Sequence, residues 1–203
     1  MPDSLLRSDD LELAGRIAHK DHAAFETLMR RHNSRLFRVA RAVLKNDADA
    51  EDCLQEAYLQ AYRNMASFQG TANLNTWLTR IVVNEALMRL RRDRRHGVVV
   101  PFGSSSQHVD DPEIMVADER QELPSRATLR HEIRQIVERR VDELPLAFRT
   151  VFVMRDVEDM SVQETADALG IPASTVRTRL FRARALLREA LARDIDSASV
   201  DAS

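Results

Sequence analysis

Arginines are the residues of this chain best suited to bind another molecule. Four of them lie between Arg177 and Arg184, and five lie between Arg89 and Arg95. The planar guanidinium group donates paired hydrogen bonds to phosphate oxygens and to the major-groove edge of guanine. The whole chain has a formal net charge of −2, so these clusters are local basic patches on a nearly neutral protein. Such segregation is typical of a nucleic-acid binder that also contacts a protein partner.

The first of these clusters belongs to a sequence that predicts a helix-turn-helix. Ser161 and Glu164 have the spacing of a capping box, in which two side chains satisfy free amides at a helix start. Gly170 suits the left-handed turn that ends a short helix, and Pro172 suits the start of the next one. In DNA-binding proteins with this motif, the second helix enters the major groove. A solvated arginine-rich helix without a ligand is the alternative interpretation.

The second helix of this motif has an apolar stripe and a polar side when its residues are placed at about 100° per residue. Val176, Leu180, Ala183 and Leu187 fall in the stripe and are expected to face the core. The remaining positions offer guanidinium and hydroxyl groups to phosphates and base edges. The residues of this helix that we expect to contact DNA are Ser174, Thr175, Arg177, Thr178, Arg179, Phe181, Arg182 and Arg184.

The other arginine cluster ends a predicted helix that follows a loop, residues 67–75, rich in turn-forming residues. Arg80 and Asn84 are four residues apart and therefore share one face of that helix. Guanidinium and amide groups beside aromatic rings suit single-stranded nucleic acid, because bases stack on the rings and arginines contact phosphates. Trp77 taken alone is more often a core residue. The candidate strand-binding residues are Phe68, Gly70, Asn73, Trp77, Arg80, Asn84 and Arg91.

The helix predicted before this loop, residues 48–65, carries a largely acidic polar face opposite an apolar stripe. This acidic face consists of Asp52, Gln55, Glu56 and Arg63. A solvated surface is the ordinary explanation of such a face, and these residues alone do not decide between solvent and a protein partner.

Composition and periodicity predict an all-α protein with two small helical domains. The chain has only five glycines and few aromatic residues, and its apolar residues recur at helical spacing. The domains are expected at residues 10–95 and 129–193. Residues 96–128 are rich in Pro, Ser, Asp and Glu, which predicts a flexible acidic linker. The polar residues 194–203 predict a disordered tail, and residues 1–8 a frayed terminus.

No residue pattern in the chain indicates catalysis or a cofactor. Phosphate-binding glycine loops, paired Cys/His sets and nucleophile motifs are missing, and the six histidines lack metal-ligand spacing. Cys53 is the single cysteine, which fits a reducing compartment and a small core residue. With no signal peptide and no apolar run of roughly 18 residues, a cytoplasmic protein is expected. We expect no enzymatic activity, no cofactor, no metal and no small-molecule substrate.

Two segments of the chain, in this order, resemble the extracytoplasmic-function sigma factors, which are two-domain initiation factors of bacterial RNA polymerase. In the first half the resemblance lies in DAEDCLQEAYLQAYRN, SFQG and NTWLTRIVVNEAL. In the second half it lies in LPLAFRTVFVMRDVEDMSVQETADALGIPASTVRTRLFRAR. The matching segments cover roughly residues 21–95 and 129–191. A helix-turn-helix alone is a weak family signal, whereas two matched blocks around a variable linker are a strong one.

The resemblance implies roles for residues in both domains. Sigma region 2 corresponds to the first domain, where the acidic face would dock on the clamp helices of the largest polymerase subunit. The loop Phe68–Asn73 would receive a flipped base of the −10 element, and Arg80 and Asn84 would read the non-template strand. Sigma region 4 corresponds to the second domain. Its contacts with the −35 duplex would be made by Arg177, Thr178, Arg179, Phe181 and Arg182.

The resemblance also implies partners for the whole chain. They are the RNA polymerase core (the clamp helices and the flap region), promoter DNA that the chain helps to melt, and an anti-sigma factor, which in this family is often membrane-bound. The sequence departs from the commonest family pattern at Gln69, where arginine is frequent, and at Thr165, where an aliphatic residue is usual.

Two other classes of function stay open on sequence grounds. A helix-turn-helix repressor or response regulator would use its first half to sense a signal or to dimerise. This hypothesis leaves the helix of Arg80 and Asn84, and the acidic face before it, without a role. The third hypothesis is a helical adaptor or anti-regulator that binds acidic proteins through its basic patches.

Overall fold

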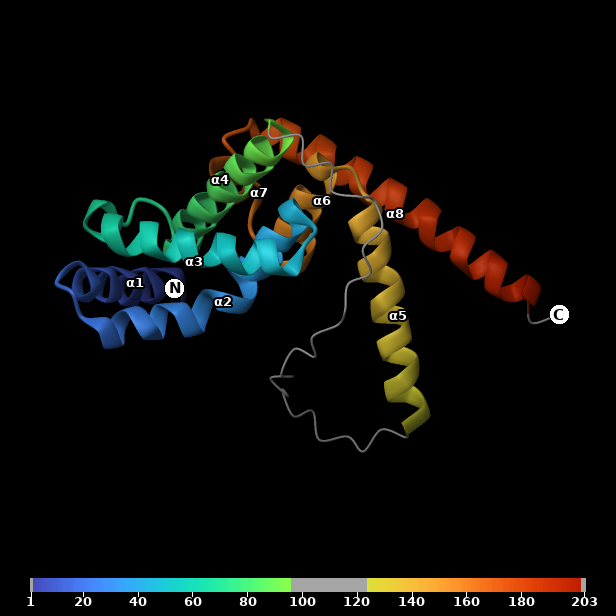
Figure 1. Ribbon diagram of the computed structural model, residues 1–203, viewed down its shortest axis with the longest axis horizontal. Helices are drawn as coiled ribbons and strands as arrows, with labels where there is room; N and C mark the ends of the chain where they lie inside the picture. The colour runs from blue at the N-terminus through green and yellow to red at the C-terminus, as the bar shows by residue number, and fades with distance from the viewer. Residues whose placement is uncertain (1, 96–123, 202–203) are drawn as a thin grey trace.

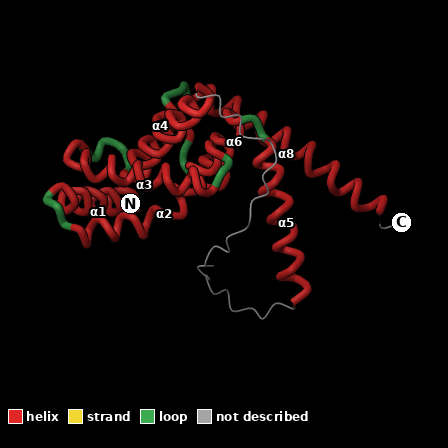
Figure 2. The backbone as a smooth tube through the Cα atoms, in the orientation of Figure 1, coloured by secondary structure: helices red, strands yellow, loops and turns green. Residues whose placement is uncertain are grey.

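The computed structural model describes residues 2–95 and 124–201, and every regular element within these ranges is helical, as expected (Figures 1 and 2). The first domain holds α1 (Pro2–Ala18), α2 (His22–Leu44), α3 (Asp47–Asn64), a 3-10 turn (Met65–Ser67) and α4 (Leu74–Arg95). The second domain holds α5 (Pro124–Glu143), α6 (Leu146–Phe152), a π-helical turn (Val153–Val157), α7 (Val162–Leu169) and α8 (Ala173–Asp201).

The first domain is organised around α2, α3 and α4, which pack together through small and branched side chains. Asp21 and Asn46 cap the starts of α2 and α3, since their side chains accept hydrogen bonds from the amides of Ala24 and Asp49. Cys53 is fully buried in this core, as expected, and burial raises the pKa of its thiol to about 12. The thiol is therefore protonated and unreactive at neutral pH.

The second domain packs α6 and α7 against the first half of α8. Val151, Ala166, Val176 and Leu180 form one small core, and Leu144, Ala183 and Leu187 form a second one farther along α8. In Figure 1, α5 and the outer half of α8 diverge from the rest of the molecule.

The two domains are in direct contact, and most of the polar part of this domain interface is made by arginines. Glu158, which is 2% exposed, accepts hydrogen bonds from Arg35 and Arg38 of α2. Arg149 is equally buried and donates to backbone carbonyls of both domains, including those of Ala42 and Leu144. The apolar part of the interface comes from the second domain, whose Met154, Met160 and Ala168 join the core of the first.

Two further contacts complete the domain interface. Arg41 of α2 forms a bidentate pair with Asp142 of α5 at 2.8 and 3.1 Å. On α4, the Thr76 hydroxyl donates to the Glu164 carboxylate of α7 at 3.2 Å. Together with Arg149, these contacts attach α5, α6 and α7 of the second domain to α2 and α4.

The ends of the elements differ from the expected boundaries in three places. α5 begins at Pro124, inside the expected linker, because proline is well suited to the first position of a helix. The expected disordered tail is wrong for residues 194–201, since α8 runs to Asp201 through a segment without glycine or proline. Likewise α1 begins at Pro2 and includes most of the segment expected to be frayed. The remainder of the linker prediction, residues 96–123, lies outside the described residues.

Candidate nucleic-acid and polymerase interfaces

The helix-turn-helix has the local geometry that its sequence predicts. The Ser161 hydroxyl accepts a hydrogen bond from the Glu164 amide at 3.1 Å, and the Glu164 carboxylate accepts one from the Ser161 amide at 2.8 Å. Gly170 ends α7 in the left-handed conformation with φ +62°. Thr165 stands where an aliphatic residue is usual in the family. Its buried hydroxyl has no hydrogen-bond partner among the described residues, which lowers the stability of the fold.

The predicted apolar stripe of α8 is buried and its predicted DNA side is largely exposed. Val176 and Ala183 are inaccessible to solvent, and Leu180 and Leu187 are nearly so. Phe181, by contrast, is 72% exposed, although phenylalanine is among the residue types most often buried. The other predicted DNA contacts on the outer surface are the exposed Ser174, Arg177, Thr178 and Arg182 and the half-buried Thr175 and Arg179.

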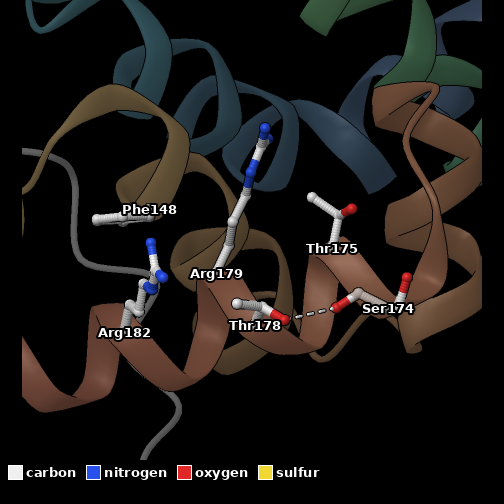
Figure 3. A pocket seen from close by; sticks show the side chains of 6 residues that line it. All are labelled: Phe148, Ser174, Thr175, Thr178, Arg179 and Arg182. Carbon is white, nitrogen blue, oxygen red and sulfur yellow. Dashed lines mark hydrogen bonds between the residues drawn. The ribbon is translucent and has the colours of Figure 1, made fainter.

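A shallow hollow of about 280 Å³ lies beside the start of α8. Figure 3 shows the side chains that line it. Five of its lining residues were predicted to contact DNA, and the sixth, Phe148, comes from α6. The packing of α6 against α8 places Phe148 beside the predicted DNA-contacting residues. The residues that line the hollow are Phe148, Ser174, Thr175, Thr178, Arg179 and Arg182.

Arg184 differs from the other arginines of α8 because its guanidinium group is already paired. It donates two hydrogen bonds to the carboxylate of Asp156, at 2.6 and 2.8 Å. It also lines a different, mostly apolar hollow with Val137 and Leu187. The structure thus separates Arg184 from the hollow that contains Arg179 and Arg182.

The predicted strand-binding loop leads directly into α4. Asn73 caps this helix, since its side-chain oxygen accepts from the Asn75 amide at 2.8 Å and its carbonyl accepts from the Trp77 amide at 3.1 Å. Phe68 and Trp77 face each other with ring centroids 5.6 Å apart and planes inclined by 57°. Both rings are partly buried against the core of the first domain, so Trp77 is in part a core residue. Gly70 turns the loop with φ +68°.

Farther along α4, Arg80, Asn84 and Arg91 are all exposed. Spacings of four and seven residues place them in one row along the helix. Other arginines of the cluster are occupied, because the buried Glu85 lies 3.6 Å from Arg89 and 3.4 Å from Arg92.

The acidic face of α3 is accessible beside the basic end of α4. Asp52, Gln55 and Arg63 are exposed and Glu56 is half-buried. The Asp52 carboxylate lies 3.6 Å from the Arg89 guanidinium and keeps 65% of its side chain exposed. Salt bridges of this exposed kind contribute little to stability, so Asp52 remains available to a partner.

The described residues offer no cluster of three or more His, Cys, Asp or Glu side chains that could hold a metal ion. None of the helices in residues 2–95 and 124–201 is both long enough and apolar enough to span a membrane.

Comparison with known proteins identifies both domains. The Sigma-70 region 2 family matches residues 28–96, and the Sigma-70 region 4 family matches residues 134–187. RNA polymerase sigma-H factor of Pseudomonas aeruginosa is 32% identical over 92% of this chain and 96% of its own length. The ECF RNA polymerase sigma factor SigM of Mycobacterium tuberculosis is 37% identical over 91% of this chain and 85% of its own length.

Solved structures show the same fold. CnrH, in complex with the cytosolic domain of CnrY, superimposes with a TM-score of 0.64 at 25% identity, covering 91% of this chain and 98% of CnrH. The sigma factor RpoE of Bartonella quintana, in complex with the anti-sigma factor NepR, gives a TM-score of 0.63 at 21% identity, covering 82% and 96%. Family matches in both domains and full-length relatives agree with the architecture, so this chain belongs to the extracytoplasmic-function sigma factors.

Proposed function

We propose that this transcription initiation factor divides promoter recognition between two surfaces of its structure. The outer side of α8 binds the −35 duplex, and the loop at residues 68–73 together with the exposed row on α4 captures the melted −10 strand. The observation that supports this best is the separation of roles along each helix. Arg80 and Asn84 on α4, and Arg177 and Arg182 on α8, are exposed, while Val82, Val83 and Leu180 between them are buried.

The proposed −10 surface favours an open promoter by binding only the separated strand. An extruded base needs a stacking wall and a polar edge reader, which the Phe68–Trp77 pair and Asn84 supply. Arg80 and Arg91 lie in the same row and neutralise phosphates of the strand. Because the duplex does not make these contacts, binding shifts the equilibrium toward the melted form.

The acidic face of α3 is the proposed contact with the clamp helices of the polymerase core. We further propose that an anti-sigma protein regulates this chain, as suggested by CnrH and RpoE, both of which were solved with a protein partner. Binding to polymerase places the working protein in the cytoplasm, and no enzymatic activity of its own is needed.

Run-off transcription tests the proposal as a whole. Purified polymerase core, incubated with a promoter library, is expected to start at specific sites only when this protein is added. A repressor would instead block transcription by a complete holoenzyme and would bind duplex DNA strongly without core. Either of these two results contradicts the sigma role.

Substitution of Arg182 or Arg177 by alanine is expected to weaken binding to the −35 duplex. The loss should be about 1–3 kcal/mol and confined to one base position if the arginine reads a base. It should be smaller and uniform over sequences if the arginine contacts phosphate. Holoenzyme binding to promoter variants measures both quantities. Arg188→Ala, another exposed arginine of α8, is the matched control, and equal losses in control and test variants would contradict the assignment.

Asn84→Ala is expected to reduce open-complex formation while leaving core affinity unchanged, because it removes the amide that reads the melted strand. Permanganate reactivity of unpaired thymines, measured at equal holoenzyme occupancy, reports the open fraction. Asn33→Ala changes an exposed asparagine of α2 and should have no effect. An unchanged open fraction in Asn84→Ala would exclude this residue from strand capture.

A further inference from the structure

Helix α1 lies outside the segment that matches sigma region 2, which begins at residue 28. It is nevertheless firmly attached to the first domain. Leu13, Ala14 and Ile17 are buried in the core, and Asp9 forms an ion pair with Arg31 of α2 at 2.8 Å. The position of α1 along the domain is therefore fixed, and with it the positions of Asp10 and Leu11.

Asp10 of α1 reaches the start of α4. Its carboxylate accepts a hydrogen bond from the Leu74 amide at 3.3 Å, across 64 positions of the chain. The first amides of a helix have no acceptor within the helix, so an added carboxylate stabilises that end and favours one position for it. The next turn of α4 carries Trp77 and Arg80, and the placement of both depends on how α4 begins.

Leu11, the next residue of α1, supports the turn of the strand-binding loop. A β-carbon added to Gly70 would lie 2.5 Å from the Leu11 Cδ2 atom, so the backbone of Gly70 rests directly against this side chain. Gly70 is thus restricted twice, by its φ of +68° and by contact with Leu11. Leu11 keeps 46% of its surface exposed, so its contact with Gly70 lies at the surface of the domain.

We propose that α1 is a functional part of the −10 reader, with Asp10 and Leu11 as positioning residues for the loop at residues 68–73. Asp10 fixes the end of the loop at α4, and Leu11 fixes its turn at Gly70. This inference rests on the proposed role of the loop in strand capture. A loop held in place before binding loses less conformational freedom when the strand arrives, so the pre-formed contacts raise affinity for the melted strand and sharpen base selection.

Binding of a single-stranded −10 oligonucleotide to holoenzyme tests the proposal, with fluorescence of a base analogue at the flipped position as the readout. Asp10→Ala and Leu11→Ala are each expected to weaken strand binding on the order of tenfold and to reduce discrimination at the flipped base. Asp10→Asn should restore part of the affinity, because its amide oxygen can still accept from Leu74. Glu12→Ala, the exposed neighbour on the same helix, is the matched control and should bind normally.

The inference and the role of the loop can fail separately. If Phe68→Ala and Trp77→Ala also bind the strand normally, the loop does not capture the strand and both ideas are overturned. If the loop variants lose binding and the α1 variants do not, only the inference is overturned. A parallel fall in melting temperature and core affinity in the α1 variants would show general destabilisation and would also overturn it.

A double-mutant cycle tests the contact itself. In the wild-type background, the alanine of Gly70→Ala is strained by the positive φ at this position, and its β-carbon also clashes with the Leu11 side chain. In the Leu11→Ala background only the strain remains, so the effect of Gly70→Ala on strand binding should be clearly smaller. Additive effects of the two substitutions would contradict positioning of the loop by Leu11.

Discussion

Arg149→Met is expected to lower the free energy of unfolding by about 3 kcal/mol, the largest loss for a single substitution in the domain interface. The guanidinium group fills a buried site and donates to the carbonyls of Ala42, Asp142 and Leu144, at the carboxyl-terminal ends of α2 and α5. Burial lowers its pKa to about 10, so the group is still charged at neutral pH. Methionine replaces only the aliphatic part of the arginine side chain and leaves these acceptors without a donor.

Chemical denaturation of the full chain measures this loss. Arg139→Met on the exposed surface of α5 is the matched control and should change stability by less than about 0.5 kcal/mol. Arg149→Lys should retain the charge but satisfy fewer carbonyls, and so fall between wild type and Arg149→Met. Equal stability of Arg149→Met and wild type would mean that water satisfies the carbonyls and that the arginine is dispensable.

Glu158→Lys is expected to separate the two domains. The substitution places a third cation beside Arg35 and Arg38 at a position that is 2% exposed, where like charges are poorly hydrated. The two arginines keep 35% and 50% of their side chains exposed, and solvent screening therefore limits the cost to about 2–3 kcal/mol. Small-angle scattering should show a larger radius of gyration with unchanged helical content.

Charge exchange provides the control for this prediction. The double substitution Glu158→Lys with Arg35→Glu restores one opposite-charge pair and should recover part of the compact form. Glu12→Lys, an exposed change of the same charge in α1, should leave the radius unchanged. If Glu158→Lys is as compact as wild type, the apolar contacts of Met154 and Met160 hold the domains without the ion pairs.

The helix-turn-helix could be predicted from sequence because its determinants are local. The capping box joins residues three apart, Gly170 needs only its own backbone conformation, and the stripe of Val176 to Leu187 follows from helical spacing. No distant residue has to be known for any of these. The predicted all-helical class follows from the same local rules applied along the chain.

The contacts that sequence reasoning missed depend on distant residues. Arg184 has the same sequence context as Arg182, yet Asp156, 28 positions away, pairs with it. The sequence indicates only that Phe148 and Leu11 are apolar. Their places beside the hollow of α8 and beside Gly70 depend on the tertiary fold. The tail was misjudged because polar composition suggests disorder, whereas the absence of a helix stop lets α8 continue.

The domain interface was beyond sequence reasoning for the same reason. Arg35, Arg38 and Arg41 recur every three residues on α2 and could equally be a solvated face. Their carboxylate partners in the second domain, Glu158 and Asp142, are more than one hundred positions away. Charge pairing over such separations leaves no trace in a single sequence.

The spacing of these three arginines also determines how the domains can move. Arg35 and Arg38 share Glu158, and Arg41 pairs with Asp142, so moving α2 away from the second domain in part would leave Glu158 buried with an incomplete counter-charge. Intermediate orientations are therefore costlier than either the docked or the fully parted arrangement. Motion between the domains should therefore be a two-state transition between a docked and a parted arrangement, and intermediate hinge angles should not be populated.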